Sequence, residues 1–257
     1  MDKEFAKKTL LITGATSGIG KATALRFAQA GASIAAVGRD EAALSKLRKE
    51  LDSSGVQCLA IRADLALEEE AAMAVSKTAE HFDGIDVLVN AAGHLSTGTI
   101  EDASLEAWDA MLRINLRAPF ILMQQALPSI IARRGNIVNV SSVTGLRAFP
   151  GVLAYCVSKA GLDQLTRCAA LELAAKGVRV NAVNPGVVVT EIHKRGGMTR
   201  EQYDAFLEHS KATHPLGRVG EAREIAELIF FLASERASWI TGATYSIDGG
   251  RAQTCAR

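Results

Sequence analysis

Short apolar runs alternate along the whole chain with stretches of helical periodicity. Seven of the runs read as strands, because each is short and ends at a turn-forming or polar residue. Most are apolar throughout rather than alternating, which is typical of parallel strands that helices cover on both faces. The predicted strands lie at residues 9–12, 33–37, 58–63, 85–89, 136–140, 178–183 and 243–247.

Helical patterns fill most of the segments between the runs, and we expect Pro119 and Pro128 to kink or break the long one at 105–131. No linker, low-complexity tract or internal repeat divides the chain. The alternation therefore predicts one α/β domain over residues 1–257, a doubly wound (Rossmann) parallel sheet of about seven strands with helices on both faces. Residues 191–214 are richer in charge and contain Gly196 and Gly197, which favours a mobile lid over a substrate.

Composition and charge narrow the class of protein. Of the 257 residues, 48% are hydrophobic and 22% charged, and the net charge is +1, so nucleic acid and anionic membrane are not expected partners. The start of the chain lacks the apolar run of a secretory signal, and no segment approaches a membrane span, so we expect a cytoplasmic protein. The four cysteines and five histidines show no paired or metal-ligand spacing, so we expect free thiols and no metal.

The turn after the first predicted strand has the features of a phosphate site. Gly14, Gly18 and Gly20 follow that strand and open a helical pattern. Glycine allows a tight turn and a close approach of phosphate, and the unpaired amides at a helix start favour an anion. The spacing differs from the common Gly-x-Gly-x-x-Gly fingerprint, and glycines also simply end strands, so the context supports the interpretation more than the motif does.

The end of the second strand bears on which nicotinamide cofactor is used. In a dinucleotide fold this strand end meets the adenosine ribose, roughly 20 residues after the glycine turn. The chain places Gly38 and Arg39 there instead of an acid, and a guanidinium suits a 2′-phosphate. NADP(H) is therefore favoured over NAD(H). The alternative is that Arg39 is a solvated loop residue paired with Asp40 or Glu41.

Three further strand ends carry small or polar residues. Asp64 could accept a hydrogen bond from the adenine amino group, or it could cap the next helix. Asn90 could lie beside the cofactor ribose, tie two strands together, or do both. The turn at Pro185 and Gly186 could fold over the nicotinamide, with Thr190 placed for its amide or for a phosphate.

A second group of residues can transfer a proton. Tyr155 and Lys159 are four residues apart, so on a helix they share one face. An ammonium beside a phenol lowers the pKa of the phenol from about 10 towards the range useful for acid–base catalysis. Ser142, just after a strand, could bond the same substrate oxygen. The set suits carbonyl reduction or alcohol oxidation, although taken alone the Tyr-x-x-x-Lys pair could be two ordinary helix residues.

The sequence says less about Asn115 and about the residues that line the substrate pocket. Asn115 lies among apolar residues, where a buried amide needs partners, so it could bond backbone and a water near the site or be purely structural. The substrate wall is expected to be mostly apolar, which suggests a hydrophobic ketone. We expect it to be drawn from His94, Val143, Leu146, Phe149, Leu153 and residues 191–214.

The motifs occur in a specific order, and four of them directly follow strands, whose carboxyl ends a parallel sheet brings to one edge. They are Thr13-Gly14-x-x-x-Gly18-Ile19-Gly20, Asn90-Ala91-Ala92-Gly93, Asn115, Ser142, Tyr155-x-x-x-Lys159, Asn184-Pro185-Gly186 and Asp248-Gly249-Gly250. With this set the chain resembles the short-chain dehydrogenase/reductase family over nearly its whole length. It departs from many members in having Ala91 where they have a second asparagine, and the tail after Gly250 has no assigned role.

The resemblance implies a catalytic tetrad of Asn115, Ser142, Tyr155 and Lys159. In the implied mechanism Tyr155 is the general acid/base, Ser142 steadies the substrate oxygen, and Lys159 lowers the pKa of Tyr155 and holds the nicotinamide ribose. Asn115 keeps a water connected to Lys159. The implied cofactor-binding residues are Gly14, Thr16, Ser17, Gly18, Ile19, Gly20, Arg39, Asp64, Asn90, Ala91, Gly93, Tyr155, Lys159, Pro185, Gly186, Val188 and Thr190.

The resemblance also implies an assembly and an activity. Members are usually homotetramers or dimers, paired through the helices around Asn115 and Tyr155 and through the carboxyl-terminal strand. We therefore expect an oxidoreductase that transfers a hydride between NADP(H) and a small carbonyl or secondary alcohol substrate. The alternatives are an NAD-dependent dehydrogenase of secondary alcohols, sugars or steroids, and a non-catalytic dinucleotide-binding sensor. The intact Ser142, Tyr155 and Lys159 argue against a sensor.

Overall fold

The predicted parallel sheet is present in the computed structural model, which describes residues 3–255. Its strands run in the order β3-β2-β1-β4-β5-β6-β7, and each neighbouring pair is parallel. This confirms the doubly wound topology, in which the strand order reverses between β1 and β4. The strands are β1 (Thr9–Thr13), β2 (Ser33–Gly38), β3 (Cys58–Arg62), β4 (Val87–Asn90), β5 (Asn136–Val140), β6 (Arg179–Pro185) and β7 (Thr244–Ile247).

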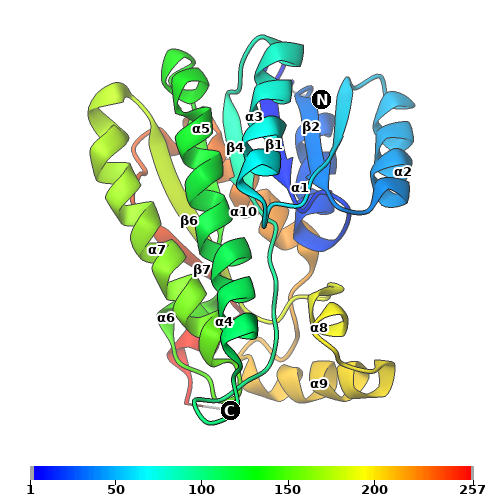
Figure 1. The fold of residues 1–257 in the computed structure, drawn as a ribbon, viewed down its shortest axis with the longest axis vertical. Helices are drawn as coiled ribbons and strands as arrows, with labels where there is room; N and C mark the ends of the chain where they lie inside the picture. Colours follow the sequence, from blue (N-terminus) through cyan, green and yellow to red (C-terminus); the bar gives the residue numbers. More distant parts are fainter. Residues whose placement is uncertain (1–2, 256–257) are drawn as a thin grey trace.

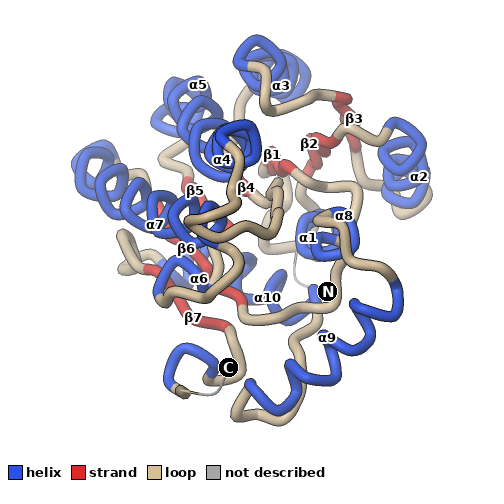
Figure 2. Tube along the Cα trace, turned by 60° about the horizontal axis from the view of Figure 1, so that its bottom comes forward, coloured by secondary structure: helices blue, strands red, loops and turns tan. Residues whose placement is uncertain are grey.

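Helices cover both faces of the sheet (Figures 1 and 2). One face carries α1 (Gly18–Gln29), α2 (Glu41–Asp52) and α10 (Ala222–Ala233), and the other carries α3 (Glu68–Phe82), α5 (Ala118–Ala132) and α7 (Leu153–Leu173). Side chains along a strand point alternately to the two faces, so Leu10 and Ile12 join one core while Leu11 joins the other. No described helix is long and apolar enough to cross a membrane.

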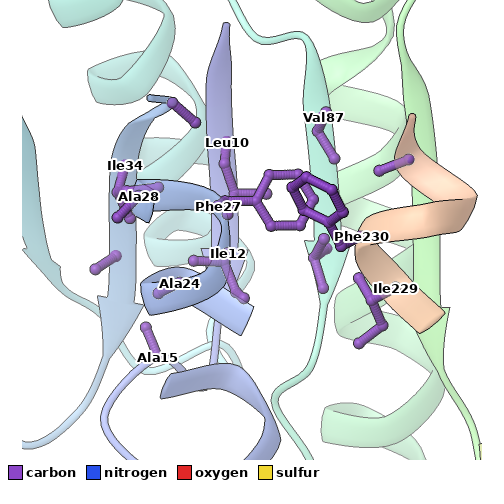
Figure 3. Packing of buried hydrophobic residues seen from close by; sticks show 14 of the residues in the cluster. Leu10, Ile12, Ala15, Ala24, Phe27, Ala28, Ile34, Val87, Ile229 and Phe230 are labelled. Carbon is purple, nitrogen blue, oxygen red and sulfur yellow. The ribbon is translucent and has the colours of Figure 1, made fainter. Parts of the chain in front are cut away.

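Aromatic packing fixes two helices on one face of the sheet. Phe27 of α1 and Phe230 of α10 lie over Leu10 and Ile12 (Figure 3), with ring centroids 5.2 Å apart. Phe5 joins them, with centroids 4.6 Å from Phe27 and 4.9 Å from Phe230. Each buried ring stabilises the fold by roughly 1.5–3 kcal/mol, and this packing holds the start of α1, which carries the glycine turn, against the sheet.

Of the two outcomes expected for the long helical stretch, a kink or a break, the structure excludes the break. The prolines do not break it: α4 (Leu105–Leu112) continues through a π-helical segment, Arg113–Arg117, directly into α5. The ring of Pro119 would crowd the carbonyl of Asn115, four residues back, and the wider π turn relieves that crowding. Pro128 lies inside α5, and nothing in the structure explains its tolerance there. The irregular turn holds Asn115.

Short elements gather beyond the carboxyl ends of the strands. They are α6 (Val143–Leu146) and the pair α8 (Ile192–Arg195) and α9 (Arg200–Thr213), which stand at the lower right of Figure 1. Three 3₁₀ turns complete the described chain, at Ala174–Lys176, Glu235–Ala237 and Arg251–Gln253. These loops and short helices surround the region where the sequence motifs meet.

Candidate active site

A cavity of about 730 Å³ lies at the carboxyl ends of the strands. It is lined by the glycine turn, by the ends of β2 to β6, by the loop 143–152 and by the segment 185–198. All of the predicted site residues line it except Asn90 and Asn115. A parallel sheet thus brings motifs far apart in the sequence to one side of the molecule, as expected.

The glycine turn is shaped for close backbone approach. Gly14 has φ of 65°, and a Cβ there would lie 2.8 Å from the carbonyl oxygen of Ala91. A Cβ at Gly20 would lie 2.2 Å from the carbonyl oxygen of Gly14. Ser17 is the N-cap of α1, but its side chain makes no capping hydrogen bond, so the first amides of the helix are left for an anion. This geometry fits the diphosphate of a dinucleotide.

The predicted acid–base residues meet at the cavity wall. Tyr155 and Lys159 lie on the first turns of α7, with only 8% and 3% of their surfaces exposed. Lys159 Nζ donates to the carbonyl oxygen of Val140 at 2.8 Å, and it lies 5.6 Å from the centroid of the Tyr155 ring. Tyr155 shares a hydrogen bond with the side chain of Ser142. The hydroxyl, the phenol and the cation therefore lie together, next to the end of β5.

Burial sets the protonation of this group. It raises the pKa of Tyr155 to about 12, although the hydrogen bond with Ser142 acts in the opposite direction. Burial also lowers the pKa of Lys159 to about 8, opposed by the charge of Asp163. The net shift of Tyr155 is upward because the cost of burying a phenolate exceeds the stabilisation by the hydrogen bond with Ser142, and the effect of Lys159 on this pKa stays a prediction. At neutral pH Tyr155 carries its proton.

Asn115 joins the loop after β4 to α7. Its Oδ1 accepts from the backbone N–H of His94 at 2.8 Å, and its Nδ2 donates to the carbonyl oxygen of His94 at 2.8 Å and to Ser158 Oγ at 3.0 Å. Ser158 Oγ in turn donates to the carbonyl oxygen of Tyr155 at 2.8 Å. The predicted bonding to backbone is confirmed, and the water relay stays a prediction.

Asn90 ties two strands together behind the cavity. Its Nδ2 donates to Asn139 Oδ1 at 2.8 Å, which joins β4 to β5, and Asn139 Nδ2 donates to Thr166 Oγ1 on α7 at 2.9 Å. The structural role considered for Asn90 is thus confirmed, and its contact with a cofactor stays a prediction. The small residues that follow it, Ala91 and Gly93, do line the cavity.

Arg39 faces the cavity without a counter-ion. Asp40 instead caps α2, its side chain accepting from the N–H of Ala43 at 3.0 Å, and Arg39 forms no ion pair within residues 3–255. Burial lowers the pKa of His94, and the positive charge of Arg39 lowers it further, so the two side chains face the same space. Pairing of Arg39 with Asp40 or Glu41 is not observed.

Asp64 also lines the cavity, at the end of β3. Its Oδ1 accepts from the N–H of Ala66 at 3.1 Å. The alternative in which Asp64 caps the next helix is wrong, because the N-cap of α3 is Leu67, three residues later. The carboxylate is therefore free of a capping role and faces the space beside β2.

The segment expected to form a lid is attached to both sides of the cavity. Arg195 of α8 donates to Ser17 Oγ in the glycine turn at 2.9 Å. The hydroxyl of Tyr203 on α9 accepts from the N–H of Thr190 at 3.2 Å and donates to its carbonyl oxygen at 2.9 Å. At the end of α9, buried His214 accepts from the N–H of Val187 at 3.1 Å through Nε2. The predicted mobility of this segment stays a prediction.

Some cavity residues were not found from the sequence. Leu146 and Leu153 do not line the cavity, whereas His94, Val143 and Phe149 do, as expected. Sequence reasoning assigned no role to the tail after Gly250, yet Arg251 lines the cavity. No local motif marks these positions, because they reach the site only through the packing of loops. The lining residues that were missed include Leu95, Thr97, Ala110, Arg113, Ile114, Pro150, Val152 and Arg251.

Comparisons with known proteins agree with this geometry. Residues 14–252 match the family model described as enoyl-(acyl carrier protein) reductase. A crystal structure of a short-chain dehydrogenase/reductase of unknown function from Caenorhabditis elegans, with cofactor, superposes with a TM-score of 0.92 at 36% identity, covering 98% of this chain and 97% of that one. The chain belongs to the short-chain dehydrogenase/reductase family. It is an oxidoreductase of a family that binds a nicotinamide dinucleotide.

Curated relatives within the short-chain dehydrogenases/reductases have different names. The 3-oxoacyl-[acyl-carrier-protein] reductase of Thermotoga maritima is 39% identical, over 95% of this chain and 97% of its own length. The glucose 1-dehydrogenase of Gluconobacter oxydans is 38% identical, over 96% of this chain and 92% of its own length. Similarity at this level therefore establishes the family and leaves the substrate to be argued from the site.

Proposed function

We propose that the chain reduces a carbonyl group with NADPH, and oxidises the corresponding secondary alcohol in reverse, with Tyr155 as the general acid/base. One observation carries the proposal. Ser142, Tyr155 and Lys159 meet, largely buried, on the wall of the same cavity that the glycine turn and Arg39 line. A binding protein without chemistry has no need of a protonated phenol and a low-pKa ammonium at the floor of its nucleotide site.

The side chains divide the work of proton transfer. The bound cofactor supplies the hydride to the carbonyl carbon. Tyr155, which keeps its proton at neutral pH, donates it to the substrate oxygen, and Ser142 steadies that oxygen by a hydrogen bond. Lys159 has a pKa of about 8 and can return a proton to Tyr155 after each turnover. Asn115 holds the helix in place through Ser158.

The preference for NADP(H) rests on Arg39. This guanidinium lines the cavity at the end of β2 with no acidic partner in residues 3–255, and it faces the same space as His94. A 2′-phosphate would supply the missing negative charge and match the donor geometry. The second candidate is an NAD-dependent dehydrogenase of secondary alcohols, sugars or steroids, and the likeness to a glucose 1-dehydrogenase favours a sugar as its substrate. The ratio of the two cofactors decides between them.

The direct test is a screen of the purified chain against a panel of ketones, aldehydes and secondary alcohols, with NADPH and then NADH. We expect oxidation of NADPH with at least one ketone, and a kcat/KM for NADPH at least about tenfold above that for NADH. Turnover with NADH and not with NADPH would support the second candidate, an NAD-dependent dehydrogenase. Tight cofactor binding without turnover of any panel member would contradict an enzymatic role.

We also propose that the chain assembles as a homotetramer or dimer. Large apolar side chains are exposed on the helices α4, α5 and α7, which lie side by side in Figure 2. They are Leu105, Phe120, Val157 and Leu171, exposed by 78%, 47%, 43% and 82%. Large apolar side chains left this exposed on neighbouring helices fit a surface that is buried in an assembly. Light scattering after size exclusion measures the mass directly, and a monomer at micromolar concentration would contradict this proposal.

A further inference from the structure

The tail after the last strand is folded back against the cavity. Asp248 accepts from the N–H of Gly250 at 3.0 Å and from the N–H of Ala252 at 2.7 Å. Arg147, from the loop 143–152, donates to the carbonyl oxygen of Ala252 at 2.9 Å. These bonds hold the 3₁₀ turn Arg251–Gln253 in one place, so the position of Arg251 is defined by the fold.

The guanidinium of Arg251 is half-buried and lies at the cavity wall. Its centre is 5.0 Å from the centroid of the Phe149 ring, and it donates to Thr213 Oγ1 at the end of α9. It forms no ion pair with any carboxylate of residues 3–255. The nearby Asp248 directs its oxygens to backbone N–H groups instead. Most of the five donors of the guanidinium are left for another partner.

The cavity around Arg251 is otherwise apolar or neutral. The loop 143–152, helix α9 and the tail place one charged side chain on it within the described chain, that of Arg251. The other lining residues from these three segments are Val143, Thr144, Phe149, Pro150, Val152 and Phe206. The acidic lining residues belong elsewhere: Asp40 and Asp64 follow β2 and β3, and Glu191 pairs with Lys194 at 3.2 Å.

We propose that Arg251 binds an anionic group of the substrate, a carboxylate, so that the substrates are oxo acids and the corresponding hydroxy acids. A half-buried guanidinium that forms no ion pair is compensated only in part by the charge of nearby Asp248, and a carboxylate both neutralises it and matches its donors in pairs. Tyr155 and Arg251 line the same cavity, and Arg251 lies against Phe149 of the loop 143–152, so a substrate whose carbonyl reaches Tyr155 can place an anionic end at Arg251. The inference rests on the carbonyl chemistry proposed above and names the substrate class for it.

The test uses pairs of substrates that differ in one charge. Methyl ketones with a terminal carboxylate, in a series of increasing chain length, are each compared with their own methyl ester. The wild-type chain is expected to prefer the acid at one chain length or more, by about tenfold or more in kcat/KM, as a charged hydrogen-bonded pair warrants. In Arg251→Met this ratio should fall to about one, and Arg251→Lys should keep part of it, because lysine retains the charge but loses the paired donors.

Two control variants separate binding of the anion from a merely structural role. Arg147→Met removes an arginine that holds the same tail but does not line the cavity, and Thr213→Val removes the hydroxyl that Arg251 contacts. Both should keep a preference for the acid, reduced at most in Arg147→Met, because the two hydrogen bonds of Asp248 still hold the tail that carries Arg251. The inference is overturned if Arg251→Met keeps that preference, if either control abolishes it, or if the wild-type chain reduces the esters and never prefers an acid. The last result leaves the carbonyl chemistry standing, whereas turnover of neither set overturns both proposals.

Discussion

Replacing Tyr155 with phenylalanine isolates the phenolic proton from everything else that the residue does. The ring stays in its pocket, so packing on α7 is unchanged, and the loss is one hydrogen bond with Ser142. Ser142 Oγ still accepts from the N–H of Thr144 at 3.1 Å, so it is not left without a partner. The free energy of unfolding should therefore change by only about 1 kcal/mol, or roughly 2–4 °C in Tm.

The effect on catalysis should be far larger than the effect on stability. Removing a positioned general acid lowers the rate by roughly 10²–10⁴-fold, and no other described side chain at this wall replaces it: Lys159 Nζ is directed to the carbonyl oxygen of Val140. The assay is kcat at saturating NADPH with a ketone from the panel, together with the Kd for NADPH from fluorescence. We expect that Kd to change by less than about fivefold, the worth of one neutral hydrogen bond.

The matched control is Tyr245→Phe, on β7, a tyrosine that packs against a core cluster and does not line the cavity. It should leave kcat unchanged. A kcat within about tenfold of wild type in Tyr155→Phe would refute the assignment, because the lost general acid is expected to be worth more than that. An equal loss in the Tyr245→Phe control would point to a general effect of removing a hydroxyl from the fold.

Three other predictions test separate parts of the site. Arg39→Ala should raise the Kd for NADPH about tenfold or more and leave that for NADH nearly unchanged, and an equal loss for both cofactors in fluorescence titrations would contradict the assignment. The pKa of Lys159 falls from 10.5 to about 8 on folding, so the folded chain binds fewer protons than the unfolded chain between these values, and its contribution to the unfolding free energy rises with pH there. Denaturant titrations from pH 8 to 10.5 should therefore show a shallower rise for Lys159→Met than for wild type; parallel curves would refute the shift. Arg195→Met removes the hydrogen bond to Ser17, so amides of residues 191–213 should exchange hydrogen faster, with Lys194→Met as the control that leaves this bond intact. Equal rates of amide hydrogen exchange in both variants would show that the bond between Arg195 and Ser17 does not hold the segment 191–213 in place.

The fold could be predicted because its signals are local. Most strands are continuous apolar runs that end at a turn-forming or polar residue, and the parallel order then places every strand end on one edge. The same argument predicts that Gly14, Asn90, Ser142 and Gly186 lie at one edge, and all of them line one cavity except Asn90, which ties β4 to β5 behind it. Positions that depend on which residue follows a strand are therefore readable from the sequence.

Features that depend on packing were not readable in this way. The π turn at Asn115 follows from local crowding by Pro119 within a continuous helix, which a proline rule reads as a break. The pKa of Tyr155 depends on how deeply the phenol is buried, and the spacing to Lys159 carries no information on burial. Arg251 reaches the cavity because the tail folds back through Asp248 and Arg147, the latter from a segment about 100 residues earlier in the chain.

The pKa shifts of Tyr155 and Lys159 determine which protonation state each side chain has before the reaction. A phenol whose pKa is raised from 10.0 to about 12 is a firm proton carrier at neutral pH, and an ammonium at about 8 gives up its proton more easily than a free lysine does. Both shifts have the same cause, since burial disfavours the charged form of each group. Donation of a proton to a carbonyl oxygen needs the phenol in the form that burial favours, whereas abstraction of a proton from an alcohol needs the phenolate that burial opposes. Reduction therefore starts from the protonated phenol that the folded chain favours, whereas oxidation by the same groups has to form the phenolate against the cost of burial.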